Sequence, residues 1–407
     1  MTLVTEIGRR ARFAKSFSTD HEVESVPPVA QPHARYIRIR VEARDFEGCP
    51  WNLTVRDESY RVVQTLTAED FRNSSKRWTL RIRGAKAFFD LRRCPNGKPF
   101  IQFDEYIWMP DNAPEHYYSI QGSTPTYLDL FSDSIDNNLR RFGDSVGMFM
   151  ASWEEESWVC SGVMVAEDLF LTNWHCGGPQ WILDPNDPGQ LKPFPENFYW
   201  QPPIVKDALV DLSFDGDERS REYIVTGVAA RNKYLDYALL EVQPLDAVGK
   251  ARPVPLRRAF AKANEPILIV HHPEGKTKQI TPSCQVADSG FPSWRSDWQE
   301  SSFTQVCDVE PGNSAAPAAD GRVRLAELPA DFHSTDFTHF CDTESGSSGA
   351  PVFDERGRLV GLHHLGFELD SATCQQKDRR NKAVRIDRIL TNLELCHPDV
   401  YKKLLIE

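Results

Sequence analysis

The sequence lacks a long hydrophobic run. Its 407 residues contain no stretch of apolar residues as long as the roughly eighteen or more that a membrane-spanning helix requires. The opening segment, MTLVTEIGRRARFAKSFSTD, also lacks the apolar core of a secretory signal. We therefore expect a protein of the cytoplasm that has no membrane partner.

The sequence also has fewer positively charged than negatively charged residues. Lys and Arg total 47 against 59 for Asp and Glu, which gives a formal net charge of -12. A protein with this balance is repelled by polyanions, so nucleic acid is excluded as a favoured partner.

The cysteines show no regular spacing. There are nine of them, an odd number, and no Cys-x-x-Cys pair occurs. This pattern predicts reduced thiols rather than a disulfide framework, and it offers no zinc-binding arrangement. The neighbouring histidines His271–His272 and His363–His364 do not change this, because adjacent residues of a strand point to opposite faces. We expect neither a metal nor another cofactor.

Turn-forming residues are abundant by contrast, with 23 Gly and 28 Pro, which favours a mainly β protein of short strands. Residues 1–33 are polar and contain prolines, and predict a flexible tail or linker. Alternation of apolar and charged positions over residues 34–120 predicts a small antiparallel β-sandwich. Residues 121–407 contain evenly spaced apolar segments typical of β-barrels, and end in a segment with helical spacing interrupted at Pro398.

The segment DTESGSSGAPVFD, residues 342–354, contains two adjacent serines between glycines. Gly and Ser are common in ordinary turns, so the segment alone does not indicate catalysis. A serine nucleophile needs an imidazole to take its proton and a carboxylate to orient that imidazole. His175 ends the apolar segment LFLTNWHC, and Asp236 precedes the apolar segment YALLEV, so both partners are available near strand ends.

Together these segments resemble the trypsin-like, or chymotrypsin-fold, serine peptidases. The chain has TNWHC from Thr172, DYALL from Asp236 and GSSGAP from Gly346, in the order that this family shows. The resemblance covers about residues 140–407 and implies a chymotrypsin-like double β-barrel with a C-terminal helix. It implies His175, Asp236 and Ser348 as the catalytic residues, because the nucleophile directly precedes the second glycine of the motif.

The resemblance also assigns supporting roles. The oxyanion hole is expected from the backbone N–H groups of Gly346 and Ser348. The S1 pocket is expected to include Asp342, Thr343 and His363. Asp342 favours a basic P1 side chain, whereas His363 favours an acidic one, so both preferences stay open.

In secreted relatives a disulfide lies beside the catalytic histidine, and Cys160 and Cys176 have the matching separation. The expectation here is that the two thiols are close but reduced. Ser347 replaces the Asp that pairs with a newly freed amino terminus in secreted trypsins, so that activation switch is expected to be absent.

The function predicted from these residues is a serine endopeptidase that acts on proteins or peptides through an acyl-enzyme on Ser348. The β domain at residues 34–120, which resembles no family, is expected to target or regulate it by binding a protein partner. The alternative is a catalytically weak, peptidase-like scaffold that binds a protein partner.

Overall fold

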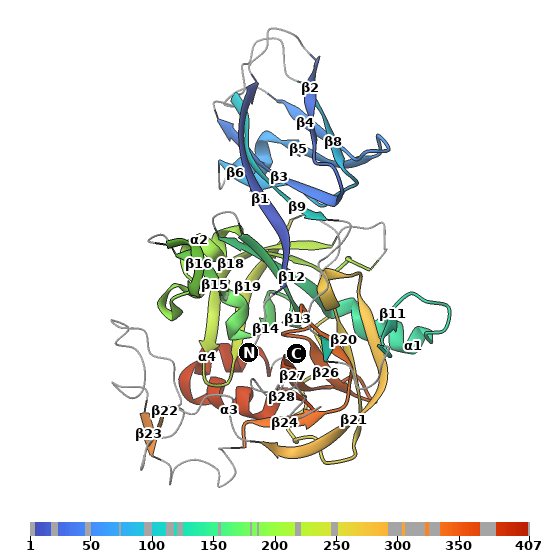
Figure 1. The fold of residues 1–407 in the computed structure, drawn as a ribbon, viewed down its shortest axis with the longest axis vertical. Helices are drawn as coiled ribbons and strands as arrows, with labels where there is room; N and C mark the ends of the chain where they lie inside the picture. The colour runs from blue at the N-terminus through green and yellow to red at the C-terminus, as the bar shows by residue number, and fades with distance from the viewer. Residues whose placement is uncertain are drawn as a thin grey trace. The chain divides into compact units, whose positions relative to one another are not determined.

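The structure is a computed structural model of the whole chain. It describes residues 5–17, 23–44, 50–72, 75–92, 100–110, 118–119, 125–153, 156–179, 181–184, 187–215, 221–245, 251–291, 303–305, 322–324, 334–366 and 380–405. Two compact units are present (Figure 1): Glu6–Pro114 with Glu154–Ser157, and Met1–Thr5 with Glu115–Trp153 and Trp158–Glu407. We call them the N-terminal unit and the barrel unit.

The N-terminal unit consists of two antiparallel sheets that share one core. The first has the order β1 (Thr5–Phe17), β9 (Phe100–Pro110), β3 (Ala34–Arg44) and β6 (Lys76–Trp78), with β7 (Ile82–Arg83) also paired to β3. The second has the order β2 (Val23–Ala30), β8 (Lys86–Arg92), β4 (Asn52–Arg56) and β5 (Val62–Thr67), followed by the short 3-10 helix Ala68–Phe71. Alternate residues such as Val41, Phe89 and Phe103 are buried together, as the alternating sequence predicts.

The structure differs from the expected flexible tail at residues 1–33, because most of this segment forms β1 and β2. The prolines at positions 27 and 28 misled the prediction. They fall where the β2–β8 register shifts, between Val26 and Val29, and β2 lies at the edge of its sheet. Proline is tolerated at an edge and at a bulge because no ladder hydrogen bond is required there.

The barrel unit contains two closed six-stranded barrels, so the expected fold class is confirmed. The first barrel has the order β12 (Val146–Trp153), β17 (Leu209–Asp211), β18 (Glu222–Asn232), β19 (Tyr237–Pro244), β14 (Leu169–Thr172) and β13 (Glu156–Ala166), and β13 pairs with β12 to close it. The second has the order β21 (Gln279–Phe291), β20 (Pro266–His271), β26 (Pro351–Asp354), β27 (Leu359–Leu365), β28 (Asn381–Arg385) and β24 (Asp336–His339), and β24 pairs with β21.

Smaller elements surround the barrels. The helices are α1 (Asn137–Arg140), α2 (Pro202–Asp207), α3 (Ile386–Cys396) and α4 (Pro398–Lys403), and the short strand pairs are β10 (Tyr118–Ser119) with β25 (Thr343–Glu344), β15 (Trp181–Asp184) with β16 (Asp187–Pro193), and β22 (Phe303–Gln305) with β23 (Arg322–Arg324). α3 packs on β27 and β28, and the break before α4 falls at Pro398 as predicted. Within the described residues, no helix combines the length and hydrophobicity needed to cross a membrane.

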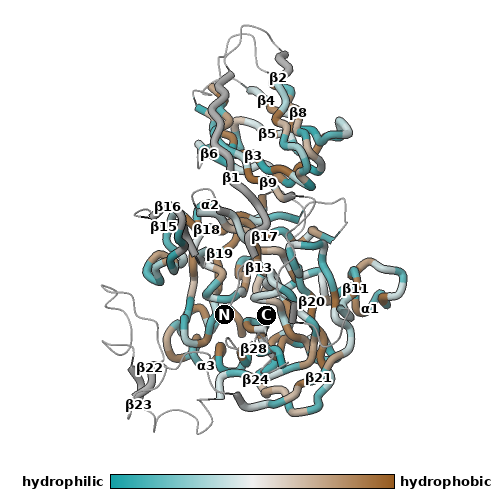
Figure 2. The backbone as a smooth tube through the Cα atoms, in the orientation of Figure 1, coloured by the Kyte–Doolittle hydropathy of each residue, from teal (hydrophilic) through white to brown (hydrophobic). Residues whose placement is uncertain are grey.

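Three hydrophobic cores explain why the sequences of the barrel strands are continuous apolar runs. In β14, Phe170 packs inside the first barrel, whereas Leu169 and Leu171 pack in a layer that also receives residues of the second barrel and of α3. In β20, Ile267 packs inside the second barrel and Leu268 in the shared layer. Strands buried on both faces lose the polar alternation of a one-sided sheet. Figure 2 shows brown hydrophobic positions recurring along these strands.

The segment that precedes the first barrel, including residues 125–130, belongs to the barrel unit. β11 (Leu128–Asp129) pairs with β21, and Leu130 is buried in the shared layer.

We predict that a chain shortened to begin at Glu115 unfolds cooperatively in urea, because the barrel unit has its own cores. A chain that begins at Phe131 loses β11 and Leu130, so its unfolding free energy should be lower by about 3 kcal/mol. Tryptophan fluorescence during urea unfolding compares the two. Insoluble protein from the Glu115 start would show that the barrel unit depends on Glu6–Pro114.

Candidate active site

The structure brings His175 and Asp236 together at the end of the first barrel. β14 and β19 are antiparallel, with Thr172 opposite Ala238, so the residues after β14 meet the residues before β19. His175 lies in the 3-10 helix Trp174–Gly177, and its Nδ1 is 2.7 Å from Oδ2 of Asp236. The backbone N–H of His175 donates to Oδ1 of the same carboxylate at 2.9 Å. The carboxylate therefore fixes both the position and the ring orientation of the histidine.

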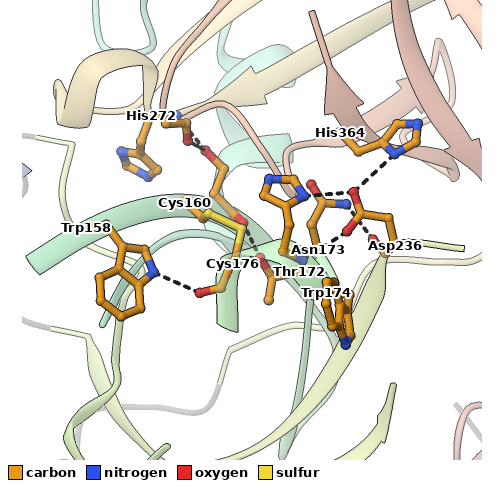
Figure 3. The surroundings of a disulfide bond; sticks show 12 residues. Trp158, Cys160, Thr172, Asn173, Trp174, Cys176, Asp236, His272 and His364 are labelled. Carbon is orange, nitrogen blue, oxygen red and sulfur yellow. Dashed lines mark hydrogen bonds and ion pairs between the residues drawn. A yellow bond between two sulfur atoms is a disulfide. The ribbon is translucent and has the colours of Figure 1, made fainter. Parts of the chain in front are cut away.

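Asp236 is fully buried and adopts a positive φ of 48°. Its backbone carbonyl accepts a hydrogen bond from the Asn173 side chain at 2.8 Å, which holds it in this conformation (Figure 3). Burial alone would raise the pKa of Asp236, but the charges and hydrogen bonds of His175 and then His364 outweigh burial and lower the pKa to about 2. Asp236 is therefore an anion at neutral pH.

A disulfide lies directly beside His175. Cys160 of β13 is bonded to Cys176, and the Trp158 indole N–H donates to the Cys176 carbonyl at 2.8 Å (Figure 3). A second disulfide joins Cys284 to Cys341. The prediction of reduced thiols is wrong for these four cysteines. Cys160 and Cys176 are close, as expected, but they are bonded. Cys284 and Cys341 are 57 residues apart and become neighbours only where β21 pairs with β24.

The loop that contains Ser348 precedes β26 in the second barrel. Gly346 has a φ of +91°, and a Cβ there would lie 2.7 Å from the His272 carbonyl oxygen. Gly349 has a φ of +83°, and a Cβ there would lie 2.1 Å from the Ser161 carbonyl oxygen. Both glycines of the motif are thus required by conformation and by close contact.

The backbone N–H groups of this loop divide into two sets. Those of Ser347, Gly349 and Ala350 donate to carbonyl oxygens of Glu344, His363 and Ser347 at 2.8–3.0 Å. Those of Gly346 and Ser348 have no acceptor among the residues that the structure describes. These two unpaired donors are the ones that the sequence assigned to an oxyanion hole.

The two adjacent serines have different surroundings. Ser347 is fully buried; its Oγ accepts the Glu344 N–H at 3.1 Å and lies 2.7 Å from Nδ1 of His271. Burial, and then His272, lower the pKa of His271 to about 3, so a neutral ring shares this hydrogen bond with the Ser347 hydroxyl. Ser348 is 7% exposed, and its hydroxyl forms no hydrogen bond with any residue that the structure describes, so it is the available one of the two.

His175 and Ser348 do not form a hydrogen bond in this structure. Nε2 of His175 is buried and lacks a partner within the described part of the chain. The two residues are nevertheless linked through Ser161 of β13, whose N–H donates to the Ser348 carbonyl at 2.7 Å. Ser161 directly follows Cys160, the disulfide partner of Cys176. Catalytic hydrogen bonds are often long before substrate binds.

The three residues expected in S1 are all buried. Oδ2 of Asp342 accepts hydrogen bonds from the backbone N–H and the hydroxyl of Thr126, at 2.8 and 2.6 Å. Thr343 belongs to β25, which pairs with β10. Nδ1 of His363 lies 3.3 Å from Nε2 of His339, and burial followed by the charge of His339 lowers the pKa of His363 well below its usual value.

Sequence reasoning assigned no role to His364, Asp336 or His271. Nδ1 of His364 lies 3.1 Å from Oδ2 of Asp236, and its Nε2 lies 3.0 Å from Oδ2 of Asp336. His364 was noticed in the doubled histidine, but nothing local in the sequence connects it to Asp236 or to Asp336, 28 residues earlier. Likewise, His271 is joined to Ser347 only by the fold.

One group of side chains has potential metal-binding atoms close together. Cys160, His175 and Cys176 place such atoms within 4.8 Å of one another. The two sulfurs are bonded to each other, and Nδ1 of His175 contacts Asp236. This group therefore has no thiolate with which to hold a metal ion in the disulfide state.

Comparison with known proteins finds a family match over part of the chain. Residues 160–326 match the family model of the trypsin-like peptidase domain, a span that includes His175 and Asp236 and ends before Ser348. No curated protein matches the chain. The similar solved structures include Rv3671c protease from M. tuberculosis in its active form, at 15% identity and a TM-score of 0.38, over 64% of this chain and 84% of that one. The inactive form of Rv3671c protease matches at 15% identity and a TM-score of 0.36, over 63% and 91%.

We predict that Cys160→Ala/Cys176→Ala lowers the unfolding free energy by about 3 kcal/mol, the value expected for a loop of this size. It should also slow labelling of Ser348 by a fluorophosphonate, because Cys176 anchors the turn that contains His175. Urea unfolding and labelling rates measure the two effects.

The matched control is Cys284→Ala/Cys341→Ala, which removes the disulfide of the second barrel. It should destabilise by a similar or larger amount, because its loop of 57 residues is longer, while it slows labelling less. Equal slowing by both variants, each still folded, would contradict a specific role for the Cys160–Cys176 bond.

Proposed function

We propose that this chain, which carries a trypsin-like peptidase domain, is a serine endopeptidase that forms an acyl-enzyme on Ser348. The observation that carries the proposal is the loop around Ser348. Within the described residues, the Ser348 hydroxyl and the backbone N–H groups of Gly346 and Ser348 have no hydrogen-bond partner. Ser161 connects this loop to β13, whose Cys160 is bonded to Cys176 beside His175. Buried polar groups in a turn with only a structural role are normally hydrogen-bonded, so three unpaired groups here favour a site that binds a substrate.

In the proposed reaction His175 acts through its Nε2. Asp236 accepts the hydrogen bond from the Nδ1–H, which leaves Nε2 as the basic nitrogen. Nε2 removes the proton of the Ser348 hydroxyl as Oγ attacks the carbonyl carbon of the scissile peptide bond. The carbonyl π electrons move to oxygen, and the N–H groups of Gly346 and Ser348 stabilise the resulting negative charge.

The tetrahedral intermediate then collapses. The imidazolium of His175 returns its proton to the leaving nitrogen as the C–N bond breaks, and an ester on Ser348 remains. Water, deprotonated by His175, attacks the ester in the second half of the reaction and releases the carboxylic acid. Asp236 stays ionised throughout, consistent with its lowered pKa.

The N-terminal unit is proposed to target or regulate this peptidase through a protein partner. The alternative, a weakly active scaffold, is less favoured because every group that the chemistry requires is present. The disulfides Cys160–Cys176 and Cys284–Cys341 favour an oxidising compartment over the cytoplasm, because such bonds persist where thiols are not kept reduced.

We predict that Ser348→Ala abolishes fluorophosphonate labelling and peptide cleavage. Ser347→Ala should keep a substantial fraction of both, since it removes hydrogen bonds to His271 and Glu344 but no reacting atom. Loss of a nucleophile usually lowers the rate by several orders of magnitude. Intact-mass measurement after labelling reads both variants, and loss of labelling in both to the same extent would contradict the choice of Ser348.

Contacts of the pocket residues favour an acidic P1 side chain. Oδ2 of Asp342 already accepts two hydrogen bonds from Thr126, so a basic P1 side chain would have to compete with them. His363 has a neutral ring at pH 7, and a carboxylate brought next to it would raise its pKa and bind the protonated form. We therefore propose that His363, rather than Asp342, reads the charge of the substrate.

We predict that cleavage after Glu exceeds cleavage after Lys, and that the preference increases as the pH falls from neutral, because a lower pH favours the protonated form of His363. His363→Gln should remove most of the Glu preference, whereas Asp342→Asn should leave it in place. A P1-varied peptide set gives kcat/KM for each. Dominant cleavage after Lys or Arg that disappears in Asp342→Asn would restore the basic alternative.

A further inference from the structure

We propose that His364 is a positioning residue of the peptidase site, a second imidazole that spans Asp236 and Asp336 and limits the basicity of His175. The proposal rests on the peptidase function proposed above, because its effect is exerted on the general base. In this role His364 acts on Asp236 and His175 and does not contact the substrate.

The geometry forms a continuous buried chain of four side chains. His175 contacts Asp236 at 2.7 Å, Asp236 contacts His364 at 3.1 Å, and His364 contacts Asp336 at 3.0 Å. Figure 3 shows the His364 ring directed at Asp236 from the side opposite Asn173. The side chains of Asp236 and His364 have no exposed surface, and that of Asp336 is 2% exposed. Water therefore contributes little screening between these charges.

A bulge in the strand explains how His364 reaches Asp236. In the β27–β28 ladder the register shifts between His363 and Leu365, so His364 is the extra residue of a bulge. Bulges re-aim the side chain of the inserted residue. His364 therefore points toward the end of the first barrel, although it belongs to the second.

The two contacts of His364 require a doubly protonated ring. A neutral imidazole has one N–H, so it would present a lone pair to one of the two carboxylates. Both carboxylate oxygens are acceptors, and both nitrogens lie within hydrogen-bond distance. Burial would lower the pKa of His364, but Asp336 and Asp236 outweigh burial and raise the pKa to about 9.

The titratable groups on the neighbouring elements do not supply this positive charge in place of His364. The titratable groups on the elements packed around His364 are Asp236 and His175 from the first barrel, Asp336 and His339 on β24, His363 on its own strand, Lys382 and Arg385 on β28, Asp354 on β26, and Asp387, Arg388 and Glu394 on α3. Asp354 pairs with Arg358, Asp387 pairs with Arg385 and Arg388, and Glu394 is exposed. His339 and His363 have lowered pKa values and are neutral at pH 7. In the ladder Lys382 lies opposite Leu365 and Arg385 opposite Gly361, and Arg385 pairs with Asp387.

The consequence for His175 follows from the charge count. With His364 protonated, the two carboxylates and the imidazolium present one net negative charge to His175. Oδ2 of Asp236 accepts hydrogen bonds from both the His175 and the His364 rings, so part of its negative charge is neutralised by His364. Without the His364 cation the site would present two negative charges, the imidazolium of His175 would be more stable, and His175 would lose its proton only at higher pH.

The test is the pH dependence of Ser348 labelling by a fluorophosphonate, which requires no knowledge of the substrate. The full chain is compared as wild type, His364→Gln, His364→Gln/Asp336→Asn, and His397→Gln as a histidine control distant from the site. The acid limb should move up by about one pH unit in His364→Gln. The double variant should move back toward wild type, because removing the Asp336 charge restores one net negative charge. His397→Gln should not move it.

The outcomes separate this proposal from the peptidase proposal. Wild-type protein that fails to label at Ser348 would contradict the peptidase function itself. Labelling with the same acid limb in wild type and His364→Gln, or a limb that Asp336→Asn fails to return, would overturn the role of His364. A merely structural role would lower the rate without moving the limb.

A measurement on the unsubstituted protein covers the case in which the variants do not fold. Ring 15N spectra of histidine-labelled wild type at pH 8 should contain one imidazole that remains doubly protonated and titrates near pH 9. Absence of such a ring in folded protein would overturn the proposal. This result does not depend on activity, so it stands apart from the labelling experiment.

Discussion

The buried carboxylate of Asp236 is the constraint on which the rest of the site depends. An isolated charge without solvent exposure is strongly unfavourable, and it is tolerated when hydrogen-bond donors surround it. Oδ1 accepts the His175 backbone N–H, and Oδ2 faces the rings of His175 and His364. The end of β14, the start of β19 and the bulge in β27 must therefore reach their places together, because each supplies part of the environment of one charge.

In the proposed active site, the two barrels contribute complementary halves. The first supplies His175 and Asp236, and the second supplies Ser348 and its unpaired N–H groups. Ser161 connects them: its N–H donates to the Ser348 carbonyl, its hydroxyl donates to the Gly346 carbonyl at 2.9 Å, and its Oγ accepts the His272 N–H at 2.9 Å. The shape of the nucleophile loop thus depends on the packing of the barrels against each other and on more than its own sequence.

The sequence predicted the parts of the site that are local and missed those that require register. The positive φ at positions 346 and 349 requires glycine, which is visible in the motif. The apolar segments before His175 and after Asp236 indicate the strands. The Asp336 contact of His364 depends on a bulge in β27, and the disulfide pairings depend on which strands become neighbours. Hydrophobic patterns predict strands, but they do not determine their pairing or the position of a bulge.

The segment that precedes the first barrel contributes contacts to the loop before Ser348. Thr126 belongs to the segment that precedes the first barrel, yet it donates to Asp342 in the loop before the nucleophile. Its neighbour Tyr127 donates to Glu344 at 2.7 Å, and Lys276 lies 3.5 Å from the same carboxylate. Burial raises the pKa of Glu344 despite these partners. Because Thr126 and Tyr127 are hydrogen-bonded to residues of the loop before Ser348, we expect a change in their segment to act on that loop.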